Sequence, residues 1–362
     1  MRVSSRKVLI AAVVVGVLVF VVYRARGLFH FGDFSGAKLV HALRDANFFL
    51  LAISVIAIYG CYALRSLRWK VFQQNLGPSH FWNIYPMTLA GFSAVFLLGR
   101  AGEPIRPLLL ARKEKLPVSG MFGIYVLERL FDAASAAVIA GIGLLLFQAQ
   151  AHTGETNSKL QAAAKTTGSL LFAGVLGAAV VLVYLRLHGT ALLERRLQKV
   201  IAAHGWKAKF ATILLEFARG VQTIRSWGQL ALAVLYSTAH WFLVLLVYLW
   251  VSHSFGGKLA SITLSDAMLV MAFTLVGSAV QVPGVGGGSQ AGSIIAYTAI
   301  FGVEREPAVA AAIVLWLISF AMCAVVGVPL LVREGWSLGE LRQMAKSEEA
   351  AELQDARGEI AE

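Results

Sequence analysis

The sequence predicts an all-α, polytopic integral membrane protein. Of its 362 residues, 58% are hydrophobic and only 14% are charged, whereas a soluble domain carries about 25% charged residues. The mean hydropathy is +0.70, and the apolar residues form runs long enough to span a bilayer. Backbone inside a bilayer must form helices or a closed barrel. No run shows the alternation of barrel strands, so we expect transmembrane helices.

The net charge agrees with a membrane protein. A charge of +12 would suggest nucleic-acid binding in a soluble protein, but here the basic residues gather in loops beside apolar runs. No RNA- or DNA-binding motif accompanies them. Such loops are attracted to anionic lipid headgroups. We therefore expect anionic membrane lipids, and no nucleic acid, among the partners.

The apolar runs predict the spans in order. The first, 8–23, resembles the front half of a signal peptide, but Arg24 and Arg26 follow it in place of a small-residue cleavage site. We interpret it as an uncleaved first span. Further runs of spanning length lie near 47–64, 133–149, 168–185, 230–251, 266–282 and 308–332, and two less regular segments lie near 82–98 and 287–303.

The distribution of Lys and Arg predicts the orientation of these spans. The connection 186–229 is rich in both and is placed in the cytoplasm, whereas 151–168 carries only two lysines and is placed outside. We expect cytoplasmic N- and C-termini and about eight crossings, with 82–98 entering the membrane and returning and 287–303 crossing it. A conventional crossing at 82–98 is the alternative.

We divide the chain into a membrane domain, residues 1–332, and a polar, acidic C-terminal tail, residues 333–362. Within the connection 186–229, apolar residues recur at helical spacing between basic ones: Phe210, Ile213, Leu214, Phe217, Val221 and Ile224. This pattern predicts an amphipathic helix lying in the cytoplasmic membrane interface.

A charged, helix-breaking segment, "LLGRAGEPIRPLLLARKEK" at 97–115, follows one of the apolar runs. Its beginning, "SAVFLLGRAGEPI" at 93–105, aligns with "SAVQVPGVGGGSQ" at 278–290. Paired Gly- and Pro-interrupted segments in two halves indicate broken helices at a transporter's binding site, and freed helix ends there suit an anion such as a lipid phosphate. The sequence thus suggests an internal repeat, with chance similarity of Gly-rich segments as the alternative.

The charges of the first interrupted segment suit a lipid headgroup. Arg100 and Arg106 are able to bind a phosphate bidentately. Glu103 is interpreted as their counter-charge, as a contact for a cationic headgroup, or as a titrating group.

A second group of charges follows about twenty residues later. Glu128 and Asp132 lie four residues apart, so they share a helix face, and Arg129 is within reach of Asp132. Ionisable residues at membrane depth commonly mark a substrate or ion path. The alternative is a purely structural ion-pair cluster near the cytoplasmic interface, where snorkelling lowers its cost.

These motifs resemble the lysylphosphatidylglycerol synthase transmembrane family, the flippase-like domain that occurs alone or fused to a soluble aminoacyltransferase in multiple peptide resistance factors. The resemblance covers about 8–332 and rests on an R-A-G-E-x-x-R loop, an E-R-x-x-D helix start and a late P-G-x-x-G segment. The matching residues are Arg100, Ala101, Gly102, Glu103, Arg106, Glu128, Arg129, Asp132, Pro283, Gly284 and Gly287.

The chain departs from the family pattern in two respects. The late segment of the family usually reads P-G-G-x-G-x-x-E, whereas this chain has Val285 in place of a glycine and Gln290 in place of the acid. Gln290 is still able to hydrogen-bond a headgroup. The sequence also ends about 30 residues after the last run, so we expect no lysyl transfer to lipid by this chain itself.

The resemblance implies a flippase that moves a lipid with an anionic or modified headgroup, a phospholipid or a polyprenyl-phosphate lipid, across the cytoplasmic (inner) cell membrane. We expect no cofactor, since no P-loop is present, and neither catalytic residues nor a metal site, since the histidines are scattered and metal motifs are missing. The alternatives are a membrane-embedded lipid or polyprenyl-phosphate transferase and a helper subunit of a lipid-modifying enzyme. His240 and Trp241 are assigned either to a path or to helix packing.

Overall fold

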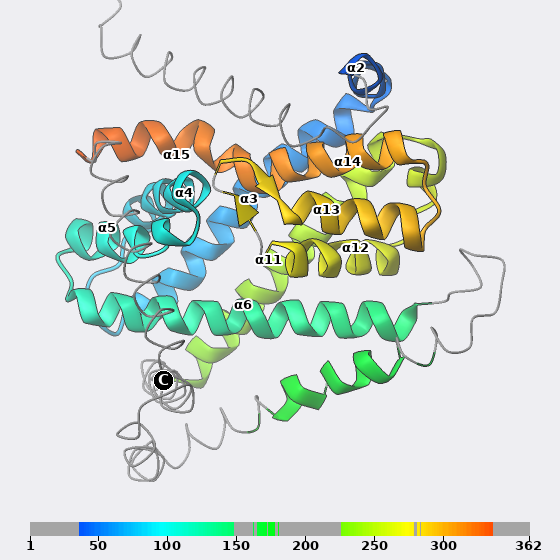
Figure 1. The fold of residues 1–362 in the computed structure, drawn as a ribbon. Coiled ribbons are helices and arrows are strands. Elements are labelled where there is room, and N and C mark those ends of the chain that lie inside the picture. The colour runs from blue at the N-terminus through cyan, green and yellow to red at the C-terminus, as the bar shows by residue number, and fades with distance from the viewer. Residues whose placement is uncertain are drawn as a thin grey trace, which may run out of the picture.

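The computed structural model describes residues 36–147, 226–278, 281–282 and 284–335, together with short helical pieces between 162 and 180. These residues are helical apart from a short antiparallel ribbon of β1 (Gln281–Val282) and β2 (Gly286–Gly287) (Figure 1). The predicted all-α class is confirmed. The expected first span at 8–23, nearly all of 186–229 and 333–362, and part of 168–185 lie outside the described residues.

Two sets of helices follow one another in the same order. The first is α3 (Phe48–Gln73), a hairpin of α4 (Phe81–Leu98) and α5 (Ile105–Glu114), and α6 (Val118–Leu146); the second is α11 (Trp227–Ser254), a hairpin of α12 (Leu264–Gly277) and α13 (Gly288–Ile295), and a rod of α14 (Arg305–Trp316) and α15 (Met322–Arg333). Shorter elements are α2 (Gly36–Asp45), the 3-10 turns η1 (Gly99–Gly102) and η2 (Gly257–Ser261), and the π-helical turns η3 (Ala296–Ile300) and η4 (Leu317–Ala321).

Side-chain caps begin several of these helices. The Asn47 side chain accepts hydrogen bonds from the backbone N–H groups of Phe49 and Leu50 at the start of α3. Ser226 forms a capping box with Gln229 at the start of α11. Each cap satisfies N–H groups that lack a partner inside the helix, so the local sequence fixes where the helix begins.

The two sets pack against each other in opposite directions. The start of α3 meets the end of α11, where Asn47 N–H donates to the Ser254 carbonyl over 2.7 Å. The end of α3 meets the start of α11, where Asn75 Nδ2 donates to Gln229 Oε1 over 2.9 Å. The helices α3 and α11 are therefore antiparallel, as expected of an inverted repeat.

The two hairpins lie between the two long outer elements (Figure 1). At one end α4 packs on α15 and α5 packs on α6, while at the other end α12 packs on α6 and α13 packs on α14. Each hairpin thus bridges from its own half to the last helix of the other half. At Gly327 a Cβ would collide with the Leu89 carbonyl, so the absence of a side chain lets α15 approach α4 closely.

Two of the expected membrane crossings are helices too short to span the membrane. Among the described residues, five helices are long and apolar enough to cross a membrane: Phe48–Gln73, Phe81–Gly102, Val118–Leu146, Trp227–Ser254 and Arg305–Arg333. Helix α12 has 14 residues, and α13 has 8 and continues through the 5 residues of η3, whereas a straight crossing needs about 20. The expected spans at 266–282 and 287–303 are therefore the two arms of a hairpin, because the Gly- and Pro-containing turn between them breaks the helix.

One other prediction also needed correction. The helix expected to begin at 133 begins at Val118, so Glu128, Arg129 and Asp132 lie inside it and not at its start. Segment 82–98, which was expected to enter the membrane and return, forms a hairpin with α5; Phe81–Gly102 is also long enough to cross, so both alternatives stay predictions.

Large apolar side chains cover much of the outer surface. Phe49, Ile56, Trp82 and Val276 are each more than 70% exposed. Exposed apolar area on this scale is unfavourable in water and favourable against lipid chains. The surface agrees with the composition in indicating a membrane protein.

Candidate functional site

The two interrupted segments that align in the sequence lie next to each other in the structure. The Gly284 N–H donates to the Phe96 carbonyl over 2.8 Å, which joins the tip of the α12–α13 hairpin to the end of α4. Gly99 and Gly284, which correspond in the alignment, have φ values of +67° and +68°. A side chain disfavours such a backbone, so the two glycines allow the sharp turns at both hairpin tips.

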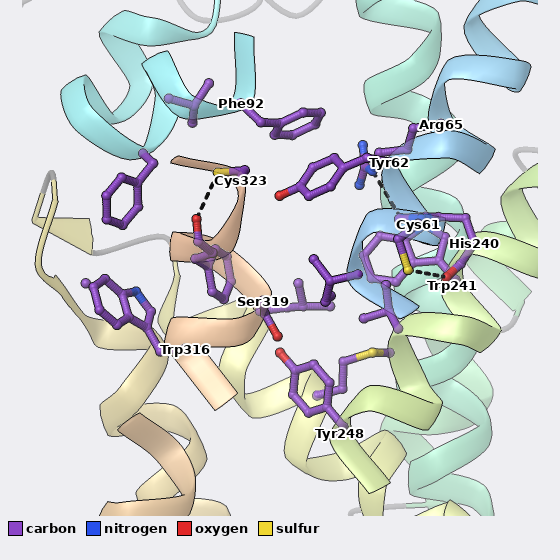
Figure 2. Close-up of a pocket in the computed structure, with 18 of the residues that line it drawn as sticks. Cys61, Tyr62, Arg65, Phe92, His240, Trp241, Tyr248, Trp316, Ser319 and Cys323 are labelled. Atoms are coloured by element: carbon purple, nitrogen blue, oxygen red, sulfur yellow. Dashed lines mark hydrogen bonds between the residues drawn. The ribbon is translucent and has the colours of Figure 1, made fainter. Parts of the chain in front are cut away.

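A cavity of about 170 Å³ lies where the hairpin tips meet (Figure 2). Both tips line it, through Gly99 on one side and Gly284 and Gly286 on the other. Aromatic side chains from α3, α4, α11 and α14 form much of the wall, and Arg65 is the one charged residue among those that line it in the described chain. The cavity is therefore an apolar chamber with a cation at its edge.

Arg65 belongs to a buried cluster of charges that four helices build. Its Nη1 donates to Asp132 Oδ2 over 2.7 Å and to Glu128 Oε1 over 3.2 Å. Arg68, one turn later on α3, donates to Asp132 Oδ1 over 2.8 Å and to Glu128 Oε1 over 3.1 Å. Both carboxylates lie on α6, and the second amino group of Arg68 donates to Ser237 on α11.

Arg106 joins the cluster from α5. It forms a two-point ion pair with Glu128, and its guanidinium lies 4.6 Å from the ring centre of Trp69 and 4.8 Å from that of Phe92. Gly91 lets α5 approach, because a Cβ there would collide with the Arg106 side chain. Aromatic faces and a carboxylate together stabilise a cation that is only 3% exposed.

The cluster carries one positive charge in excess. Three guanidinium groups, of Arg65, Arg68 and Arg106, are paired with two carboxylates. His240 adds no charge. Its Nε2 accepts a hydrogen bond from Arg65 Nε over 3.1 Å, so this nitrogen is unprotonated and the ring is neutral. Arg65 is the member of this positively charged cluster that lines the cavity.

Several predicted site residues occupy other environments. Arg100 is exposed while Arg106 is buried, so the two side chains lie in different environments. Glu103 accepts a hydrogen bond from the Tyr125 hydroxyl, and the counter-charge of Arg106 is Glu128. Arg129 lies over the Tyr125 ring, 5.0 Å from its centre, while Asp132 is held by arginines of α3.

The remaining motif residues shape the backbone. Gly102 is buried, and a Cβ there would collide with the Ala94 carbonyl. The absence of a side chain therefore lets η1 pack closely against α4. Gln290 accepts from the Gly287 N–H over 2.6 Å and donates to the Val285 carbonyl over 3.1 Å. Its amide therefore closes the β1–β2 turn and does not line the cavity. Pro283 lies outside the described residues.

Arg65 and Arg68 were not among the site residues expected from the sequence. The predicted span ended at 64, so both arginines were counted as loop charges, whereas α3 continues to Gln73. The available signal was their i, i+3 spacing, which puts both on one helix face. Among the described residues, no group of three or more His, Cys, Asp or Glu side chains is arranged to hold a metal ion.

An α-helical membrane protein with two inverted sets of helices, whose interrupted hairpins meet at a cavity beside buried charges, is the class that this fold and site define. The chain belongs to the family described as Lysylphosphatidylglycerol synthase TM region, which matches residues 8–327. The resemblance seen in the sequence is thereby confirmed. No curated protein and no solved structure matches the chain.

Proposed function

We propose that this protein is a lipid translocase that moves a lipid with an anionic or modified headgroup between the leaflets of the cytoplasmic membrane. The observation that carries the proposal is the cavity at the meeting point of two inverted, interrupted hairpins. In transporters with inverted repeats, such a meeting point binds the substrate. The family membership supports a membrane-lipid role.

The charged residues supply a route for a headgroup. Tyr125 contacts Glu103, Arg129 and Arg106, and Arg106 shares Glu128 with Arg65 at the cavity edge. A headgroup thus has polar contacts between the η1 region and the cavity while its acyl chains stay in the bilayer. In this proposal Arg100 and Gly102 lie at the outer end of the route, and Gly284, Gly287 and Gln290 hold the opposite hairpin tip.

Filling the cavity tests the proposal without breaking an ion pair. Val244 of α11 lines the cavity, and Val244→Trp should abolish the movement of fluorescent phosphatidylglycerol across proteoliposome membranes, measured by dithionite quenching. Val234 lies on the same helix and is 49% exposed, so Val234→Trp is the matched control and should transport normally. Leu275→Trp fills the cavity from α12 and serves as the second blocking variant.

The outcomes separate the alternatives. Lost movement with an unchanged melting temperature in either blocking variant supports the translocase. Normal movement in both excludes the cavity as the route. If the unmodified chain moves no lipid, the transferase or helper-subunit function is favoured, and partner enzymes should then be sought by co-purification.

A further inference from the structure

Four buried hydrogen-bonding groups at the cavity have no partner among the described residues. They are His240 Nδ1, Trp241 Nε1, Trp316 Nε1 and Ser319 Oγ, and all four belong to residues that line the cavity (Figure 2). His240, Trp241 and Trp316 are each less than 8% exposed. Buried polar groups nearly always have a partner, so four unpartnered groups on residues around one cavity point to a ligand.

The chemistry of these groups defines what the ligand must offer. An indole N–H only donates. The neutral His240 ring accepts at Nε2 from Arg65, so its proton is on Nδ1, which also donates. Ser319 is able to donate as well. No Asp, Glu, Asn or Gln side chain lines the cavity in the described chain, so the ligand has to bring the acceptors.

The positive charge of the cluster beside the cavity favours an anionic ligand. The adjacent cluster as a whole has one positive charge in excess, and Arg65, which pairs with Glu128 and Asp132, is its member at the cavity edge. An oxyanion offers several acceptor oxygens and a negative charge, whereas an ammonium group would find no carboxylate on the wall. The cavity is also smaller than the roughly 300–1,000 Å³ that encloses a drug-sized ligand, so it fits a headgroup and not a whole lipid.

We propose that this cavity binds the phosphate of a lipid whose headgroup is net anionic, and that it discriminates against aminoacylated and zwitterionic headgroups. That the ligand is a lipid rests on the proposed translocase function. That the bound group is a phosphate rests on the hydrogen-bond donors alone. Trp316 and Ser319 come from the second half of the protein and Arg65 from the first, so both halves contact the same phosphate.

Binding to the purified full chain in detergent tests the donor set directly. The probe is dioctanoyl phosphatidylglycerol, with affinity measured by calorimetry. Trp316→Phe and Ser319→Ala each remove one donor and should weaken binding about tenfold, the effect of losing a hydrogen bond to a charged acceptor. The controls are Trp250→Phe and Thr88→Val, since neither residue lines the cavity and the Thr88 hydroxyl is likewise buried without a partner among the described residues; neither should change the affinity.

Stability distinguishes this role from a structural one. Removing a buried group that has no partner should leave the melting temperature of the ligand-free protein unchanged or raise it, while a structural role would lower it. If Trp316→Phe fails to fold, the lipid affinity and melting temperature of Ser319→Ala test the proposal without it. Equal affinities in cavity and control variants would overturn the proposal.

Other ligands identify the headgroup and its source. Dioctanoyl phosphatidylcholine and lysyl-phosphatidylglycerol should bind at least about tenfold more weakly than phosphatidylglycerol, and equal binding would refute the charge argument. Inorganic phosphate and glycerol 3-phosphate should bind far more weakly; if they match the lipid, the site serves a soluble anion and the proposed lipid source is wrong. Selective lipid binding without transbilayer movement would retain this site and reject the translocase.

Discussion

Glu128 is the acceptor on which the charge cluster depends. Its two oxygens accept hydrogen bonds from Arg65, Arg68 and Arg106, and the side chain is 1% exposed. Burying charges is costly unless each is paired. The three arginines face two carboxylates, Glu128 and Asp132. If Glu128 is removed, one carboxylate is left to neutralise three positive charges.

Neutralising Glu128 should therefore destabilise the protein strongly. We expect Glu128→Gln to lower the free energy of unfolding by about 3–5 kcal/mol, because three buried guanidinium groups are left with one carboxylate. Thermal unfolding in detergent measures the effect. Asp45→Asn is the matched control, since Asp45 pairs with His41 on the surface and its side chain is 69% exposed. Similar melting temperatures for the two variants would contradict this account.

Several charged residues singled out in the sequence lie close together in the structure, but most of their partners were not predicted. Arg106, Glu128 and Asp132 do come together, whereas Glu103 bonds to Tyr125 and Arg129 stacks on the same ring. Local spacing indicates contacts within one helix. The ion pairs that form here join α3, α5 and α6, and the faces that these helices turn toward each other depend on packing across the whole bundle.

At the scale of the elements, the turn between α12 and α13 depends on one side chain. Gln290 accepts from the Gly287 N–H, as the third residue of a capping box does, and donates to the Val285 carbonyl. A glutamate, the family's usual residue here, would keep the first of these bonds. The substitution in this chain thus preserves the acceptor that the turn needs.

Replacing Gln290 should show this capping role. Gln290→Ala leaves a partly buried N–H and a buried carbonyl without their partner and should cost about 1–3 kcal/mol of stability. Gln290→Glu keeps the acceptor and should cost less. Thermal unfolding of the two variants side by side gives the comparison, and a glutamate variant as unstable as the alanine variant would count against the capping role.

Apolar runs predicted the long helices well and the interrupted ones poorly. The run at 230–251 lies within α11, because nothing in it disfavours a helix. The run at 133–149 marks only the last part of α6, because its polar residues at 128, 129 and 132 end the apolar window without ending the helix. The run at 266–282 exceeds α12, since hydrophobicity does not show that a glycine-rich turn will redirect the chain.

At the scale of the whole molecule, the antiparallel packing of α3 and α11 holds the two halves together. Reciprocal hydrogen bonds between the Asn75 and Gln229 side chains join one end of this pair, and the backbone bond from Asn47 to Ser254 joins the other. The predicted cytoplasmic placement of both termini concerns residues outside this core and stays a prediction from the loop charges.

Cysteine cross-linking tests this arrangement. In a chain with Cys61→Ala and Cys323→Ala, the pair Asn75→Cys and Gln229→Cys should form an intramolecular disulfide on mild oxidation, seen as a gel-mobility shift. The pair Asn75→Cys and Ser254→Cys should not, because these residues lie at opposite ends of the two helices. Cross-linking of the second pair alone would mean that α3 and α11 run parallel.

The packing of each hairpin against the last helix of the other half has a consequence for biosynthesis. Ser93 of α4 donates to the Cys323 carbonyl over 2.9 Å, and the two residues are 230 positions apart in the chain. At about 5–20 residues per second, a ribosome completes this partner roughly 10–50 s after it has made α4. During that interval the first hairpin lies in the membrane without the helix that finally covers it. We expect the insertion machinery or a chaperone to shield it from other nascent chains until α15 is made.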